Sequence, residues 1–153
     1  MKNSKKNWFH DECIIEITSN SINGDNFLPR NLVDYKSSNS YASKNYINSY
    51  FCIDLIDQRI QIHDYVIRNP EYTENFHLED WVLEVSNDKT NWITIDSRCL
   101  KGTDTYLCKV KWPSKNFYRY IRIRQTGKAY TDDKFPYIFG VRSIDFYGKF
   151  LRP

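Results

Sequence analysis

Three histidines (His10, His63 and His77) and four cysteines are the residues of this 153-residue chain from which a nucleophilic or acid–base site would be built. Asp64 follows His63 directly, and a carboxylate neighbour of this kind can orient a histidine as a general base. The sequence contains no nucleophile elbow, no His-Glu-x-x-His motif and no phosphate-binding loop, and it has only five glycines. We therefore expect a protein that is not an enzyme, in which His63 is a strand or bulge residue.

The cysteines are Cys13, Cys52, Cys99 and Cys108, and each lies within or beside an apolar, strand-like run. They form no Cys-x-x-Cys pair, so the closely spaced ligand pairs that are typical of zinc sites are missing. We expect buried, reduced thiols that pack like small hydrophobic side chains.

Short segments along the chain alternate between apolar and polar residues, which is the pattern of half-buried β-strands. Phe51, Ile53 and Leu55 share one face of such a segment, and Asp54 lies on the other. The segments 81–86 and 92–96 are joined by polar turn residues and are typical of a hairpin. The expected strands are 13–18, 50–55, 59–69, 81–86, 92–96, 106–112, 117–125 and 138–147. The expected core includes Phe51, Ile53, Leu55, Trp81, Leu83, Val85, Ile121, Ile123, Ile144 and Phe146.

One of these segments, 59–69, changes its apolar parity partway along. Ile60 and Ile62 lie on one side, whereas Tyr65 and Ile67 lie on the other side after the polar pair His63-Asp64. A β-bulge near His63 accounts for this change, because one extra residue turns the following side chains to the opposite face.

No stretch of eleven or more residues keeps an apolar stripe at helical spacing. Many short strands separated by polar turns predict an all-β fold, a jelly-roll β-sandwich of about eight antiparallel strands. We expect one domain over residues 12–150, preceded by a tail or linker over 1–11. Long or polar connections over 19–30, 36–49, 68–79 and 126–137 are where such a scaffold would bind a ligand.

The charges are nearly balanced, with 22 Lys and Arg against 19 Asp and Glu, and the basic residues are scattered along the chain. Nucleic-acid binding normally needs a concentrated basic face, so we expect no nucleic-acid partner. There is no signal-like apolar segment and no apolar run of about 18 residues that would span a bilayer. We expect a cytoplasmic protein without a membrane partner, since the loops offer only Phe27-Leu28 and Phe76 as apolar spikes.

Five segments, in order, resemble the discoidin-like family, that is, the coagulation factor V/VIII C-type or galactose-binding-like domains. They are Asn31-Leu32-Val33-Asp34, Tyr50-Phe51-Cys52-Ile53-Asp54-Leu55, Trp81 to Asp88 followed by Trp92, Tyr118-Arg119-Tyr120-Ile121-Arg122-Ile123, and Ile144-Asp145-Phe146-Tyr147-Gly148. The resemblance covers the chain from about residue 12 to 149. Gln125-Thr126-Gly127 after the Arg-Ile-Arg strand is similar to the intracellular branch, whose members often accompany scaffold domains in larger proteins.

The resemblance implies a non-catalytic module whose ligand meets the loops at one end of the sandwich. A sugar site needs an aromatic ring for the C–H face of the sugar and planar donors or acceptors for its hydroxyls. The matching loops supply both types, and the ligand-binding residues that we expect from them are Tyr41, Asn45, Tyr46, Arg68, Tyr72, His77, Lys128 and Tyr130.

The chain departs from the family in three places. Cys13 has no partner near residue 148 for the disulfide that staples extracellular members, which is consistent with a reducing compartment. Ser143 stands where some sugar-binding members have a calcium-binding glutamate, so Asp25 and Asp34 are only weak calcium candidates and no cofactor is expected. Lys89 replaces the glycine that is frequent in the hairpin turn.

Two kinds of partner remain open at this point, a carbohydrate and a protein recruited within a larger intracellular assembly. A further alternative is that the loop tyrosines pack only on their own loops. Arg119, Arg122 and Arg124, with Lys109 and Lys111, are compatible with a basic stripe for an acidic peptide or an anionic lipid. A solvated outer sheet face balanced by neighbouring carboxylates is the better explanation of these charges.

Overall fold

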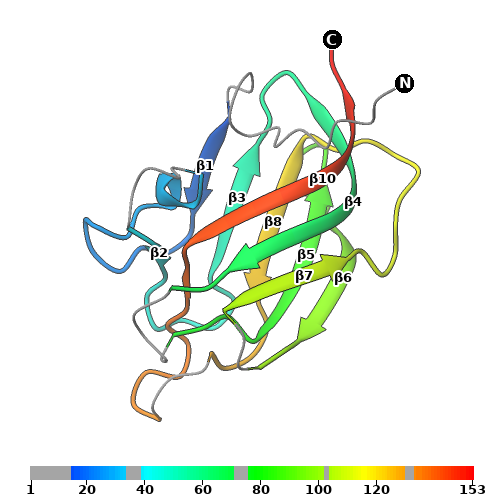
Figure 1. Ribbon diagram of the computed structural model, residues 1–153. Coiled ribbons are helices and arrows are strands. Elements are labelled where there is room, and N and C mark those ends of the chain that lie inside the picture. Colours follow the sequence, from blue (N-terminus) through cyan, green and yellow to red (C-terminus); the bar gives the residue numbers. More distant parts are fainter. Residues whose placement is uncertain (1–14, 34–38, 71–75, 102–103, 130–132) are drawn as a thin grey trace.

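The computed structural model describes residues 15–33, 39–70, 76–101, 104–129 and 133–153, which contain ten strands and one short 3-10 helix (Figure 1). The helix, η1, spans Pro29–Leu32. In the described residues no helix has the length and apolar character that a membrane span requires. The strands are β1 (Glu16–Ser19), β2 (Tyr41–Ala42), β3 (Tyr50–Asp54), β4 (Arg59–Arg68), β5 (Asp80–Ser86), β6 (Ile93–Cys99), β7 (Thr105–Lys109), β8 (Tyr120–Gln125), β9 (Gly140–Val141) and β10 (Ser143–Leu151).

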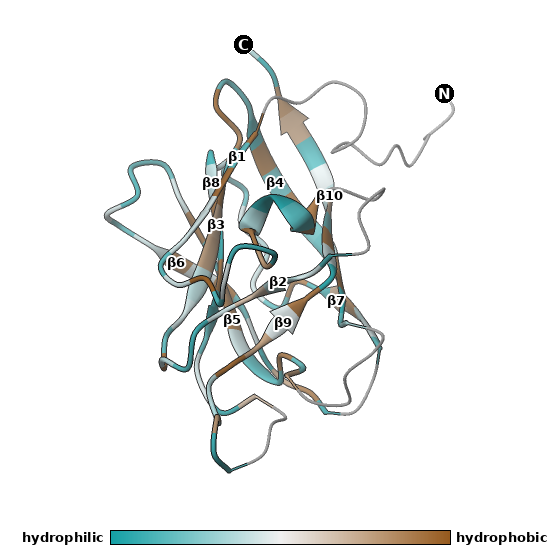
Figure 2. Cartoon of the chain, turned by 90° about the vertical axis from the view of Figure 1, so that its left-hand side faces the viewer, coloured by the Kyte–Doolittle hydropathy of each residue, from teal (hydrophilic) through white to brown (hydrophobic). Residues whose placement is uncertain are grey.

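Eight of these strands form two antiparallel sheets that pack face to face. The larger sheet has the order β1-β3-β8-β5-β6, and the smaller has the order β10-β4-β7. Figure 2 views these two layers from the side, with η1 and the small β2-β9 ribbon beside them. This arrangement confirms the expected all-β jelly-roll sandwich of about eight strands.

The core between the sheets is made by the inward side chains of the alternating strands. All ten expected core residues are buried, from Phe51 and Trp81 to Ile144 and Phe146. The inner face of β8 pairs directly with both neighbours, since Ile123 lies opposite Phe51 of β3 and Leu83 of β5. Hydrophobic alternation was therefore sufficient to locate these ten residues of the core, because a strand with one buried face repeats every two residues.

The parity change in β4 is a β-bulge, as expected. Tyr147 pairs with Asp64 and Gly148 pairs with Ile62, so His63 is the extra residue on β4. The bulge turns Tyr65 and Ile67 into the core and leaves Asp64 on the outer face. His63 is exposed, and its carbonyl oxygen accepts a hydrogen bond from Val110 N.

The turn between β5 and β6 shows why related turns favour glycine. The Asp88 carboxylate accepts hydrogen bonds from the backbone N–H groups of Thr90 (2.9 Å) and Asn91 (2.7 Å), and these bonds lower the pKa of Asp88. Lys89 adopts φ of 60°, a left-handed conformation that costs other residues more than glycine.

The single strand expected over 138–147 is instead two strands. β9 pairs with β2, whereas β10 pairs with β4, and the chain changes sheets at Arg142, whose N–H donates to Arg68 O. Alternation continues through such a change, so the sequence pattern does not reveal it.

The cysteine expectation is correct for two residues and wrong for a third. Cys52 and Cys108 are buried, and burial raises the pKa of the Cys52 thiol to about 11. Cys99 is exposed because it ends β6, an edge strand, with its side chain directed outward. Cys13 lies outside the described residues.

These environments predict the reactivity of the thiols. In a Cys13→Ser chain, we expect Ellman's reagent to modify one thiol quickly, that of Cys99, and to reach Cys52 and Cys108 only on unfolding. A hydrogen bond to Asp80 raises the pKa of Cys99, so its reaction should accelerate as the pH rises through the alkaline range. Rapid modification of two or three thiols in the native protein would contradict the burial of Cys52 and Cys108.

Candidate functional site

The long loops gather at one end of the sandwich. Strands β1, β6 and β8 run in one direction and β3 and β5 run in the other, so the connections 20–49 and 126–139 share an end with the start of β5. In Figure 1 the described segments just before β3 and just before β9 lie at the lower end of the molecule, whereas the segment after β1 runs along its left side. The described parts of the connections before β3 and after β8 therefore meet at the same end of the larger sheet.

Two of these loops are joined by hydrogen bonds. Ser43 N donates to Phe139 O (3.0 Å), and Phe139 N donates to the Ser43 hydroxyl oxygen (3.1 Å). Tyr137 N donates to Asn45 Oδ1 at 2.9 Å. The Ser43–Ser49 segment is thus held against residues 137–139, although the two lie more than 90 positions apart in the sequence.

This junction presents an aromatic and polar surface to solvent. Tyr46 is 61% exposed and Phe135 is 39% exposed, and the Lys134 ammonium lies 5.3 Å from the centre of the Phe135 ring. Asn45 uses its carbonyl oxygen for Tyr137 N, which leaves its side-chain N–H groups directed away from that bond. An exposed ring next to a fixed planar amide is the combination that a sugar ring and its hydroxyls require.

Tyr41 does not belong to this surface. Its ring is fully buried, packs edge-on against Phe51 and Phe139 with ring centres 5.5 Å and 5.7 Å away, and its hydroxyl donates to Ser21 O (2.9 Å). Burial raises its pKa to about 12. The β2–β9 pairing brings Tyr41 into the core, so this side chain offers no ring face to a ligand.

Arg68 ends β4, and its guanidinium is bound to the protein itself. Arg68 Nη1 lies 2.7 Å from Asp145 Oδ2 and also donates to the Ser143 hydroxyl oxygen. The ion pair holds the Arg68 guanidinium against β10.

His77 is buried beneath the loops, where it forms an isolated bridge with Gly140. Its Nε2 has no hydrogen-bond partner among the described residues. Lys128 is exposed in the loop that follows β8. Tyr72 and Tyr130 lie outside the described residues.

Of the weak calcium candidates, only Asp25 lies in the described residues. Asp25 is exposed, Asp34 lies outside the described residues, and Ser143 is buried with its hydroxyl accepting from Arg68. In the described part of the chain, no three His, Cys, Asp or Glu side chains are grouped as metal ligands would be.

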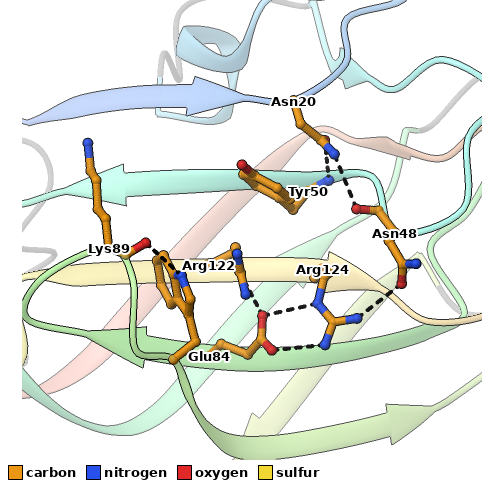
Figure 3. Close-up of polar contacts among 8 residues, drawn as sticks. Asn20, Asn48, Tyr50, Glu84, Lys89, Arg122 and Arg124 are labelled. Atoms are coloured by element: carbon orange, nitrogen blue, oxygen red, sulfur yellow. Dashed lines mark hydrogen bonds and ion pairs between the residues drawn. The ribbon is translucent and has the colours of Figure 1, made fainter.

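The three arginines that the sequence allowed as a basic stripe form a balanced network on the outer face of the larger sheet, and Lys109 lies on β7 of the other sheet. Glu84 accepts from Arg122 Nε (2.7 Å) and Arg124 Nη2 (2.9 Å), and Arg124 also donates to Asn48 Oδ1 (Figure 3). The Arg122 guanidinium carbon lies 4.0 Å from the centre of the Trp92 ring. These contacts, with the Arg119–Asp54 ion pair at 2.7 Å, confirm the solvated-face explanation.

Two residues of the loop-end surface, Phe135 and Tyr137, were not identified from the sequence as candidate ligand-binding residues. They lie in the expected loop 126–137, which is rich in aromatic and charged residues, so the loop itself was recognised. Their position next to Asn45 depends on a hydrogen bond between loops that are distant in sequence, and no local pattern indicates it.

No protein-family model and no curated protein matches the chain. Solved structures do match it. A CBM32 module from a family 31 glycoside hydrolase of Clostridium perfringens superposes with a TM-score of 0.74 and 17% identity, covering 88% of this chain and 91% of the module.

Two further modules superpose over most of their length. CpGH89CBM32-5 of C. perfringens, solved with GalNAc-β-1,3-galactose, has a TM-score of 0.72 at 12% identity and covers 88% of this chain and 95% of the module. The fucose-binding module SpX-3 of Streptococcus pneumoniae has a TM-score of 0.66 at 15% identity and covers 88% of this chain and 93% of the module. The chain therefore has the discoidin-like, galactose-binding-like jelly-roll fold that these binding modules share.

Proposed function

We propose that the chain is a non-catalytic carbohydrate-recognition module that binds a glycan at its loop end. The observation that carries this proposal is the junction of residues 43–49 with residues 137–139, which fixes Asn45 beside the exposed Tyr46. The solved modules of the same fold support the proposal, since two of them are described by the sugars that they bind.

The chemistry of this surface suits a neutral or weakly polar sugar. The rings of Tyr46 and Phe135 would pack against C–H faces, and the Asn45 amide and the Lys134 ammonium would donate to hydroxyl oxygens. Because the Asn45 side chain is already fixed by Tyr137 N, little conformational entropy is lost when it binds.

A protein partner remains the alternative class of ligand. The scattered positions of the exposed apolar side chains favour a glycan. A stable protein interface needs a broad apolar patch. Apart from Tyr46 and Phe135 at the loop end, the exposed large apolar side chains in the described residues are spread over loops, β6, β7 and the end of β10, and they are Phe27, Ile47, Ile93, Leu107, Trp112 and Leu151.

The proposal includes a setting within a larger protein. The module with the highest superposition score named above comes from a glycoside hydrolase, and a recognition domain of this kind would deliver a neighbouring domain to its glycan. The free Cys52 and Cys108 thiols support a reducing, cytoplasmic location.

Glycan-array screening of the intact chain, followed by calorimetry, tests the binding site. We expect Tyr46→Ala to weaken binding about tenfold, because the exposed ring supplies an apolar platform. Asn45→Asp keeps the acceptor for Tyr137 N and removes the N–H donors, so it should also weaken binding without unfolding the loop.

Trp112→Ala is the matched control, since it removes an exposed ring at the other end of the sandwich and should leave affinity unchanged. A glycan array without hits would contradict the proposal, and so would a Tyr46→Ala variant that binds as tightly as the wild type.

A further inference from the structure

A second candidate site lies on the outer face of the smaller sheet, away from the loop end. A groove of about 620 Å³ there is lined by residues of all three strands, including Asp64 and Val66 of β4, Leu107 and Lys109 of β7, and Tyr147 of β10. This volume is within the range of about 300–1,000 Å³ that is typical of small-molecule sites.

The strand register arranges these side chains in two rows. Tyr147, Asp64 and Lys109 are successive cross-strand partners, and Asp145, Val66 and Leu107 form the next row. Since neighbouring strands lie about 4.8 Å apart, a row across three strands spans about 10 Å, enough for one or two sugar rings.

The two charged side chains in the groove are exposed to solvent and have no protein partner in the described residues. In the described part of the chain, neither the Asp64 carboxylate nor the Lys109 ammonium makes a hydrogen bond or an ion pair, although the residues are direct cross-strand partners and both are exposed. The Asp64 carboxylate, an acceptor, and the Lys109 ammonium, a donor, therefore lie side by side and are available to a ligand. Their charges cancel, so the groove has a net charge close to zero.

The apolar part of the groove lies beside this pair. Leu107 is 79% exposed, the highest value among the large apolar side chains in the described residues, whereas Val66, its partner in the ladder, is only 7% exposed. Tyr147 is half-buried at the other end of the charged row. An exposed leucine and a half-buried tyrosine ring next to one acceptor and one donor are complementary to a sugar ring with adjacent hydroxyls.

The bulge at His63 creates this arrangement. Without the extra residue, the alternation from Ile60 and Ile62 would direct Asp64 into the core. Bulges are frequent beside functional sites because they redirect a side chain. The bulge places Asp64 in the same outer row as Lys109 and Tyr147.

From this geometry we infer that the groove on β10-β4-β7 is a second binding site, for an uncharged saccharide unit. Asp64 accepts hydrogen bonds from its hydroxyls, Lys109 donates to them, and Leu107 and Tyr147 contact its C–H face. The inference goes beyond the loop-end site and needs neither Tyr46 nor Asn45, so each site can fail separately.

The second binding site can be tested by NMR. Amide correlation spectra of the isotope-labelled protein are recorded with galactose, fucose and GalNAc-β-1,3-galactose as probes at millimolar concentration. We expect at least one probe to shift the signals of residues 64–66, 107–109 and 147. Asp64→Asn and Lys109→Met should each weaken this response about tenfold. Both side chains are exposed and unbonded, so neither variant should change the melting temperature.

Asp57→Asn, which alters an exposed carboxylate in the β3–β4 turn, is the matched control and should respond like the wild type. Tyr46→Ala should remove shifts at residues 44–48 and 134–138 and leave those of the groove. The inference is overturned if no probe shifts residues 64–66 and 107–109, or if those shifts persist unchanged in both groove variants.

Discussion

Asp96→Ala is expected to lower the free energy of unfolding by about 3–5 kcal/mol, because it removes one partner from a buried ionic and hydrogen-bonded cluster. The Asp96 carboxylate has no exposed surface, and it accepts from the Tyr65 hydroxyl (2.6 Å), Arg98 Nε (2.7 Å) and Lys111 N (3.2 Å). The Tyr65 hydroxyl oxygen in turn accepts from Trp81 Nε1 at 3.0 Å.

The cluster joins the two sheets, since Tyr65 lies on β4 and Asp96 and Trp81 lie on β6 and β5. Without the carboxylate, the Tyr65 hydroxyl has no acceptor and the largely buried Arg98 guanidinium has no counter-ion. Leaving such groups unsatisfied costs about 1–3 kcal/mol each in addition to the cavity.

Urea denaturation at neutral pH measures this effect, and Asp96→Asn is the matched variant. Asparagine keeps an acceptor oxygen and removes only the charge, so we expect it to lose roughly half as much stability as alanine. An Asp96→Ala protein within about 1 kcal/mol of the wild type would show that the cluster contributes little to stability.

Gly148→Ala is expected to destabilise the protein by about 3 kcal/mol or more, because a Cβ atom at this position collides with backbone. An added Cβ would lie 1.9 Å from Gln61 O and 2.9 Å from Gln61 C, on the strand segment that carries the His63 bulge. Those atoms belong to the β4–β10 ladder, so they can move only if the strand register moves.

Gly127→Ala provides the control. Its Cβ would lie 2.5 Å from Asp80 Oδ2, which can rotate away, and 2.8 Å from Asp80 Cβ, which needs a small backbone shift, so the clash is milder than one of 1.9 Å with a backbone oxygen. We therefore expect a clearly smaller loss for Gly127→Ala in the same denaturation experiment. Equal losses for the two variants would mean that the backbone at the bulge is not the obstacle.

Gly148→Ala also links the fold to the groove on the smaller sheet. If the bulge shifts, Asp64 leaves the row that it shares with Lys109 and Tyr147. A Gly148→Ala protein that still folds should therefore lose the sugar-induced shifts of residues 64–66 and retain those of the loop end.

The features that the sequence determined are those that depend on neighbours along the chain. Alternation identified every expected core residue, and the parity change at His63 located the bulge, because both follow from the two-residue repeat of a strand. Turn chemistry located the β5–β6 hairpin, where Asp88 caps the turn.

The features that only the tertiary structure decided depend on residues far apart in sequence. Tyr41 is a core residue because β2 pairs with β9. Arg68 is unavailable to a ligand because it forms an ion pair with Asp145, 77 positions away. A bulge at Ile95, on β6, turns the charged Asp96 inward toward Tyr65, which local alternation does not predict.

The same distinction separates the two binding surfaces. Loop composition predicted which end of the sandwich carries Tyr46 and Asn45, but the contact with Tyr137 that fixes them exists only in the folded chain. The row of Tyr147, Asp64 and Lys109 is set by the pairing of three strands. A sequence specifies which face of a strand each side chain occupies, whereas its neighbours across a sheet are chosen by register, which arises only when distant strands pair.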